Sequence, residues 1–118
     1  MKSLLIINRQ APWSGPGARE ALDIALAGGA FDLPIAMLFL DDGALQLMPQ
    51  QDPQKLQQKD LGANLQALPM FGVDSLYVSA RSLTERGMLP TTLTLPAEVL
   101  DDTALRTLIE RYDQVVTI

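Results

Sequence analysis

Short, unbroken apolar runs bounded by polar or turn-forming residues recur along the chain. Residues 4–7 (Leu-Leu-Ile-Ile) end at Asn8, and residues 35–40 (Ile-Ala-Met-Leu-Phe-Leu) end at Asp41-Asp42-Gly43. Runs of this length and character are typical of strands that are buried on both faces of a parallel sheet. Further strands are predicted at residues 73–79, 91–95 and 115–118.

The segments between these runs have apolar residues at helical spacing. A helix is predicted from Ala18 to a stop at Gly28-Gly29, and a short helical turn at residues 44–48. A longer, glutamine-rich helix is predicted from Asp52-Pro53. Residues 82–85 (Ser-Leu-Thr-Glu) match a capping box that starts another short helix, and the last helix is predicted to begin near residues 101–102.

Strands that alternate with helices predict the fold class. We expect one three-layer α/β/α domain over residues 1–118, with a five-stranded, mainly parallel sheet covered by helices on both faces. A chain of 118 residues is long enough for one such core and too short for two ordinary domains. Ligands and partners of these folds gather at the carboxyl ends of the strands, which here are followed by residues 8–17, 41–48 and 79–82.

Composition removes most catalytic chemistry. The chain has no cysteine and no histidine, which excludes a thiolate nucleophile, a disulfide and an imidazole acid or base. Its net charge of −5 and scattered basic residues argue against direct nucleic-acid binding. No apolar run is long enough for a signal peptide or a membrane span, so a cytoplasmic location is expected, with no cofactor and no metal. Because 47% of the residues are apolar and 19% are charged, some apolar surface is predicted to contact partner chains.

Four features of the sequence are candidate sites. Gly15-x-Gly17 could cradle a phosphate, but it lacks the third glycine and the P-loop lysine, so a structural turn is favoured. Asp41 and Asp42 could bind Mg²⁺ or a ribose hydroxyl, but a turn and helix cap is favoured because no third oxygen ligand is near. Ser79 ends a strand, where a nucleophile would suit, yet no histidine can activate it. Trp13 either packs on its own domain or anchors an interface.

Three segments in order resemble one family. Residues 17–23 (Gly-Ala-Arg-Glu-Ala-Leu-Asp), 39–47 (Phe-Leu-Asp-Asp-Gly-Ala-Leu-Gln-Leu) and 82–88 (Ser-Leu-Thr-Glu-Arg-Gly-Met) resemble the TusC/DsrF branch of the DsrE-like sulfur-relay family. The resemblance implies a cytoplasmic heterohexamer, a dimer of heterotrimers with TusB-like and TusD-like sisters. It implies that TusA-like and TusE-like proteins take part indirectly, and that persulfide sulfur is relayed toward 2-thiolation of a tRNA wobble uridine. In that family the TusD-like subunit carries sulfur on a cysteine, and Ser79 matches this cysteine's position.

The residues and the resemblance together predict a non-catalytic structural subunit. We expect the glutamine-rich helix to contact partners, together with five candidate residues: Trp13, Asp41, Asp42, Leu45 and Met48. Two alternatives stay open. One is a small-molecule or nucleotide-binding α/β domain that uses the loop at residues 15–17 with Asp41 or Asp42. The other is a DsrEFH-like subunit of a sulfur-oxidation relay, because sequence resemblance does not fix the direction of sulfur flow.

Overall fold

The structure is a computed structural model, and it describes residues 2–11, 15–31, 33–48, 65, 67–73, 75–90, 93 and 96–118. Trp13 and the predicted helix from Asp52 lie outside the described residues, as do four of the five residues of the predicted strand at 91–95. All the statements below concern the described part of the chain.

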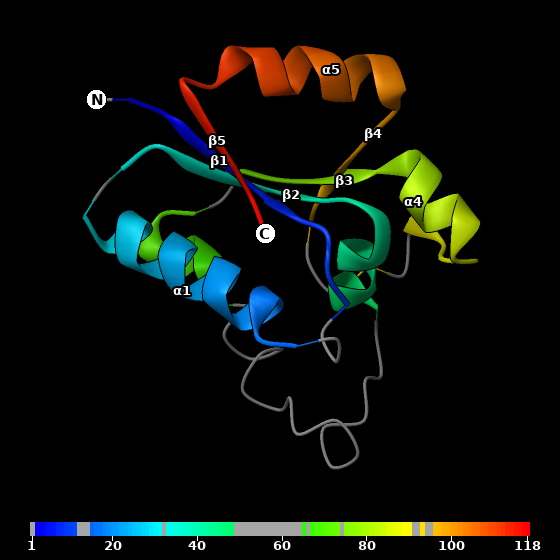
Figure 1. Ribbon diagram of the computed structural model, residues 1–118, viewed down its shortest axis with the longest axis horizontal. Helices are drawn as coiled ribbons and strands as arrows, with labels where there is room; N and C mark the ends of the chain where they lie inside the picture. Colours follow the sequence, from blue (N-terminus) through cyan, green and yellow to red (C-terminus); the bar gives the residue numbers. More distant parts are fainter. Residues whose placement is uncertain are drawn as a thin grey trace.

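A five-stranded parallel sheet forms the centre of the molecule (Figure 1). Its strands are β1 (Leu4–Asn8), β2 (Ile35–Phe39), β3 (Ser75–Ser79), β4 (Glu98–Leu100) and β5 (Gln114–Thr117). They lie side by side in the order β4-β3-β2-β1-β5, and every neighbouring pair is parallel. Strand β1 thus has a neighbour on each side, β2 and β5.

Helices cover the two faces of the sheet, as Figure 1 shows. Helix α1 (Gly17–Ala30) covers one face, where its small and apolar residues pack with Ile6, Met37 and Phe39. Helix α5 (Asp102–Arg111) covers the other face, where Leu105 and Leu108 pack with alternate residues of the same strands. Successive strand residues point to opposite faces, so all of β2 is apolar, as is β1 up to its last residue, Asn8. The predicted three-layer arrangement is confirmed.

Helix α1 continues through Gly28 and Gly29, so the prediction that these glycines stop it is wrong. Gly29 is needed for close packing against backbone, whereas a side chain at Gly28 would meet the movable end of the Ile35 side chain. A Cβ on Gly28 would lie 1.9 Å from Cδ1 of Ile35, and one on Gly29 would lie 2.3 Å from the carbonyl oxygen of Phe71. Glycine therefore lets the end of α1 approach the sheet and the short 3-10 helix η2 (Leu68–Phe71) closely.

The fourth strand of the sheet was missed by the sequence pattern. Strand β4 begins at Glu98, beyond Pro96, whereas the prediction placed a strand at residues 91–95. Leu93, the described residue of that segment, is not in a strand. Strand β4 has three residues and lies at the edge of the sheet, so it is too short to show the alternation by which strands are predicted.

Two further elements lie at the carboxyl ends of the strands. Strand β2 leads into the 3-10 helix η1 (Asp41–Leu47), and β3 leads directly into helix α4 (Ala80–Glu85). Leu65 and Leu68 are both buried in the core. Within the described ranges, the chain has no helix long and apolar enough to cross a membrane.

Candidate functional site

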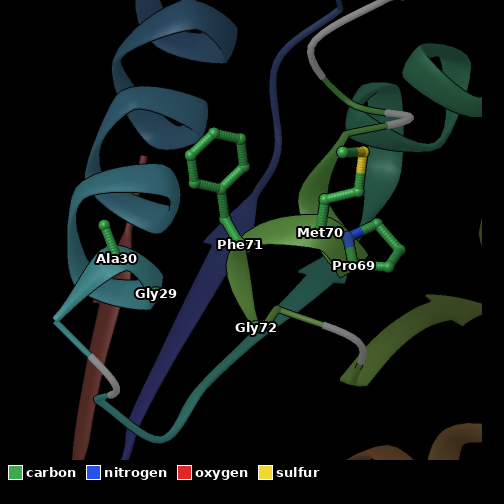
Figure 2. Close-up of a pocket in the computed structure, with 6 residues that line it drawn as sticks. All are labelled: Gly29, Ala30, Pro69, Met70, Phe71 and Gly72. Carbon is green, nitrogen blue, oxygen red and sulfur yellow. The ribbon is translucent and has the colours of Figure 1, made fainter.

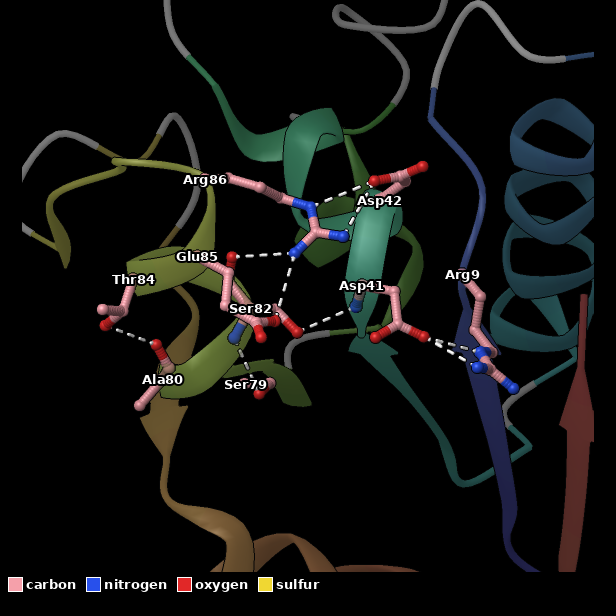
Figure 3. A network of polar contacts seen from close by, with 9 residues as sticks. All are labelled: Arg9, Asp41, Asp42, Ser79, Ala80, Ser82, Thr84, Glu85 and Arg86. Carbon is pink, nitrogen blue, oxygen red and sulfur yellow. Dashed lines mark hydrogen bonds and ion pairs between the residues drawn. The ribbon is translucent and has the colours of Figure 1, made fainter.

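Segments that follow three different strands converge at the carboxyl edge of the sheet, as the parallel topology predicts. The guanidinium of Arg9, after β1, pairs with the carboxylate of Asp41 at 2.8 Å. The backbone N–H of Asp41, after β2, donates to the hydroxyl oxygen of Ser82 in α4 at 2.8 Å. These contacts, drawn in Figure 3, tie the ends of β1, β2 and β3 into one polar network.

Ser79 has a structural role in this network. It is the N-cap residue of α4, and its buried hydroxyl oxygen accepts a hydrogen bond from the backbone N–H of Ser82. The predicted capping box is therefore wrong, because Ser82 lies inside the helix three residues after the true cap. The Ser82 hydroxyl instead accepts from the backbone N–H of Asp41. The two serines therefore connect the end of β3 to the start of η1 through hydrogen bonds.

The paired aspartates are engaged by arginines. Asp41 pairs with Arg9, while Asp42 accepts from two nitrogens of Arg86, the shorter distance being 2.8 Å. Arg86 also donates to the carbonyl oxygen of Ser82. Neither aspartate caps η1 through its side chain, because the N-cap residue is Leu40 and it makes no side-chain cap bond. The predicted aspartate helix cap is thus wrong, and these carboxylates anchor cross-links between elements.

Asp41 also has an uncommon backbone conformation. Its φ of 51° lies in the left-handed region, which residues other than glycine rarely adopt and which aspartate tolerates better than most. The conformation turns the chain sharply from β2 into η1 and brings the Asp41 N–H to Ser82. Among the described residues, no group of three or more acidic side chains lies together as a metal-binding group would.

The glycine loop before α1 has no third glycine, and it contacts its own chain. A Cβ on Gly17 would lie 2.2 Å from Oε1 of Gln10, so the Gln10 side chain lies against the start of the helix. The N-cap position of α1 is Pro16, which makes no side-chain cap bond. Gly15 has a φ of 133°, which favours glycine and fits the turn that the sequence predicts.

Two buried amides at this edge were missed by the sequence reasoning. Asn8 ends β1 with 1% of its surface exposed, and neither atom of its amide group has a hydrogen-bond partner among the described residues. Gln46, equally buried, donates to the backbone carbonyl of Gln10 at 3.1 Å. A signal was present for Asn8, because it is the polar residue that directly ends an apolar strand.

Gly43 allows the tight contact between η1 and β1. A Cβ at this position would lie 1.9 Å from the carbonyl oxygen of Asn8, a backbone atom that cannot swing aside. The same carbonyl accepts a hydrogen bond from the N–H of Leu40. Leu45 and Met48, the apolar residues predicted to face partners, are half-buried along η1 and just after it.

A second surface lies at the amino ends of the strands. The end of α1 and η2 surround an open pocket of about 510 Å³, lined by Gly29, Ala30 and the segment 69–72 (Figure 2). Met70 and Phe71 of this lining are exposed apolar residues, as are Phe31 and Leu33, which follow α1 in the chain; we call these four residues the η2 patch. Met70 is 86% exposed and Phe31 is 79% exposed, which is unusual for side chains of this size. The sequence did not predict this patch, because its two halves are distant along the chain.

One tyrosine pair lies on the α5 face, away from both surfaces. Burial raises the pKa of Tyr112 above its ordinary value of 10.0, and the neighbouring Tyr77 adds to the rise through its charge and a hydrogen bond. The Tyr112 phenol is therefore neutral at pH 7 and offers no base for chemistry.

Comparison with known proteins shows the family to which the chain belongs. The DsrE/DsrF-like family model matches residues 2–118. The chain belongs to the DsrE/DsrF-like family. A Pseudomonas aeruginosa protein named Protein TusC homolog is 75% identical over 117 residues, which cover 99% of this chain and 98% of that protein. The resemblance to this family noted in the sequence is thus confirmed.

Solved structures confirm the family fold. The ychN protein from E. coli superposes with a TM-score of 0.84 at 18% sequence identity, with all of both chains covered. A protein of unknown function from Methanobacterium thermoautotrophicum gives a TM-score of 0.69 at 13% identity, also over all of both chains. At these identities the likeness concerns the fold alone.

Proposed function

We propose that this chain is a TusC-type subunit of a sulfur-relay complex that supports 2-thiolation of the wobble uridine in tRNA. The observation that carries the proposal is the 75% identity to a Protein TusC homolog over nearly the whole of both chains. A DsrE/DsrF-like family membership over residues 2–118 supports it.

In this role the chain acts without catalysing the sulfur transfer. A persulfide relay needs a thiolate that accepts and releases sulfur, and the sequence has no cysteine. Ser79, at the position that matches the family's cysteine, is 3% exposed and serves as a helix cap. The reactive cysteine belongs to a TusD-like sister, and this chain supports the surface that presents it.

The complex is a cytoplasmic heterohexamer with TusB-like and TusD-like sisters, in which residues 1–118 act as a single DsrE/DsrF-like domain. TusA-like and TusE-like proteins exchange sulfur with the complex and do not depend on a thiol of this chain. The carboxyl edge supports a scaffold role, because its polar network cross-links three strand ends and occupies both Asp41 and Asp42.

The contact surface for a sister lies along residues 41–48, with Asp41, Asp42, Leu45 and Met48 as its members. Trp13, the fifth candidate contact residue, lies outside the described residues. Leu45 and Met48 are half-buried in the isolated chain, so each leaves apolar surface that a partner can cover. The ion pairs of Asp41 and Asp42 hold η1 in place, which keeps this surface pre-formed before association.

Co-expression with TusB-like and TusD-like chains tests the proposal. The wild-type chain is expected to co-purify with both sisters, with the mass of a hetero-oligomer by native mass spectrometry. The double variant Leu45→Lys with Met48→Lys is expected to reduce co-purification at least tenfold, because it places charge in a desolvated contact. Thr107→Lys, on the exposed side of α5, is the matched control and should co-purify like wild type.

The possible outcomes distinguish a wrong function from a wrong contact surface. A wild-type chain that binds neither sister contradicts the proposed function. Full co-purification of the Leu45→Lys, Met48→Lys variant contradicts the assigned surface only. Calorimetry with nucleotides and Mg²⁺ covers the ligand-binding alternative, for which we expect no heat of binding, because Asp41 and Asp42 are already paired with arginines.

A further inference from the structure

Strand β5 is an edge strand whose four residues are all exposed. Its one neighbour in the described sheet is β1, and Figure 1 shows it as the outer strand next to β1. Val115 lies in register with Leu5 on the α5 face, and Val116 lies in register with Ile6 on the α1 face. The two valines are 39% and 38% exposed, so neither helix covers this strand fully.

The backbone of β5 leaves an ordered row of hydrogen-bonding groups pointing outward. Gln114 and Ile118 direct their N–H groups to the carbonyls of Ser3 and Ile7, on the inner side. Alternation along a strand then turns the N–H and C=O of Val115 and Thr117 away from β1. Within the described ranges, no hydrogen bond to these outward groups is recorded.

The opposite edge of the sheet is protected, whereas this edge is not. Strand β4 has three residues, contains the charged Glu98 and follows Pro96. Short length, charge and a nearby proline all keep an edge strand from pairing with another chain. Strand β5 reads Gln-Val-Val-Thr, with no charge, no proline and no glycine. An uncharged, β-branched edge is a template for pairing with another extended chain.

We propose that β5 pairs antiparallel with β5 of a second copy of this chain, about a two-fold axis at Val116. In this register Val115 lies opposite Thr117 of the second copy, and Thr117 lies opposite its Val115. Both are outward-pointing residues, so each pair exchanges two backbone hydrogen bonds, about four in all. Val116 lies opposite its own counterpart, in a position where side chains of paired strands touch.

The strand suits a second copy because it is self-complementary. Two-fold pairing brings the same segment against itself, so any charge in it would meet a like charge. Residues 114–118 carry no charged side chain, and the adjacent Asp113 is held inside its own chain by the N–H and hydroxyl of Ser3. The pairing joins two five-stranded sheets into one continuous sheet and covers both valines. This inference goes beyond the proposed function and does not depend on it.

Thr117→Pro is the principal test. Proline removes one outward N–H per copy, and it is tolerated on an edge strand where that N–H does not bond the neighbouring strand. Thr117→Val is the matched control, because it keeps the N–H and the β-branched shape. We expect wild type and Thr117→Val to be dimers by light scattering, and Thr117→Pro to dissociate at least tenfold more readily. If Thr117→Pro fails to fold by circular dichroism, Val116→Lys with Val116→Thr as its control replaces it, since two lysines then meet on the axis.

Hydrogen exchange gives the residue-level result. The amides of Val115 and Thr117 should be protected at high chain concentration and lose that protection on dilution, while the amide of Val116 stays protected at both. A wild-type chain that is monomeric at all concentrations overturns the proposal, as does a Thr117→Pro variant that is as dimeric as wild type. In a complex with the sisters, Thr117→Pro should halve the mass of the complex. If the variant complex instead loses a sister subunit, self-pairing of β5 is overturned. Failure of the sisters to bind at all contradicts the proposed function and leaves the lone-chain measurement to decide this inference.

Discussion

At the scale of single residues, the role of each polar side chain at the carboxyl edge is set by the residue that it contacts. Ser79 caps a helix, Ser82 accepts from Asp41, and Asp42 holds Arg86. Each ion pair here is at least partly exposed, and such pairs contribute about 0 to 1 kcal/mol. Their effect is therefore to fix the geometry of η1 and α4 more than to stabilise the fold.

Replacing the buried Asn8 by aspartate should make the free energy of unfolding depend on pH. Asn8→Asp keeps the size of the side chain but places a carboxyl where no described partner is available. Burial would raise the folded-state pKa of this carboxyl above its unfolded value of about 3.9. The unfolded state then ionises first, so the free energy of unfolding falls as pH rises from 4 toward 7, by about 1.4 kcal/mol for each pKa unit of the rise.

Urea unfolding of Asn8→Asp and wild type at pH 4 and pH 7 measures this effect. Thr107→Asp is the control, because Thr107 is exposed in the middle of α5 and its substitution should give a difference that hardly changes between the two pH values. An Asn8→Asp variant with the same loss of stability at both pH values would show that the site hydrates the carboxylate.

At the scale of elements, helix starts and close contacts decide how the strands are joined. Helix α5 begins as predicted, with the Asp101 carboxylate accepting from the N–H of Ala104. Helix α4 begins three residues earlier than the capping-box pattern indicated, because Ser79 takes the cap position. Strand β3 therefore passes into α4 without a loop, which places Ser82 beside Asp41.

Ser79→Ala should lower the free energy of unfolding by about 1 kcal/mol, because the Ser82 N–H loses its acceptor in a buried position. Urea denaturation measures it, with Thr84→Ala as the control. Thr84 also lies in α4, but its hydroxyl is exposed and donates to the Ala80 carbonyl, so its loss should cost less than about 0.5 kcal/mol. Equal losses for the two variants would contradict the capping role of Ser79.

At the scale of the whole molecule, three surfaces remain open around a well-filled core. They are residues 41–48 at the carboxyl edge, the η2 patch at the amino edge, and the β5 edge. They lie on different sides of the sheet, so one copy could contact several chains at once. This arrangement is typical of a subunit within a larger assembly.

Met70→Lys tests the η2 patch as a further contact for a sister subunit. Because Met70 is 86% exposed, the substitution should change the free energy of unfolding by less than about 0.5 kcal/mol while weakening co-purification with a sister several-fold. Thermal unfolding and native mass spectrometry measure the two effects, and Thr107→Lys again serves as the control. Unchanged co-purification would remove the patch from the set of contact surfaces.

The sequence by itself determined the α/β class, the first two strands, helix α1 and the start of α5, because continuous apolar runs and caps are local signals. It also determined that no thiol chemistry is available to this chain, since it has no cysteine. Only the tertiary structure decided the position of β4, the arginine partners of Asp41 and Asp42, the burial of Asn8 and the η2 patch. Each of these depends on residues far apart in the chain, which the parallel crossovers bring together and which no local pattern encodes.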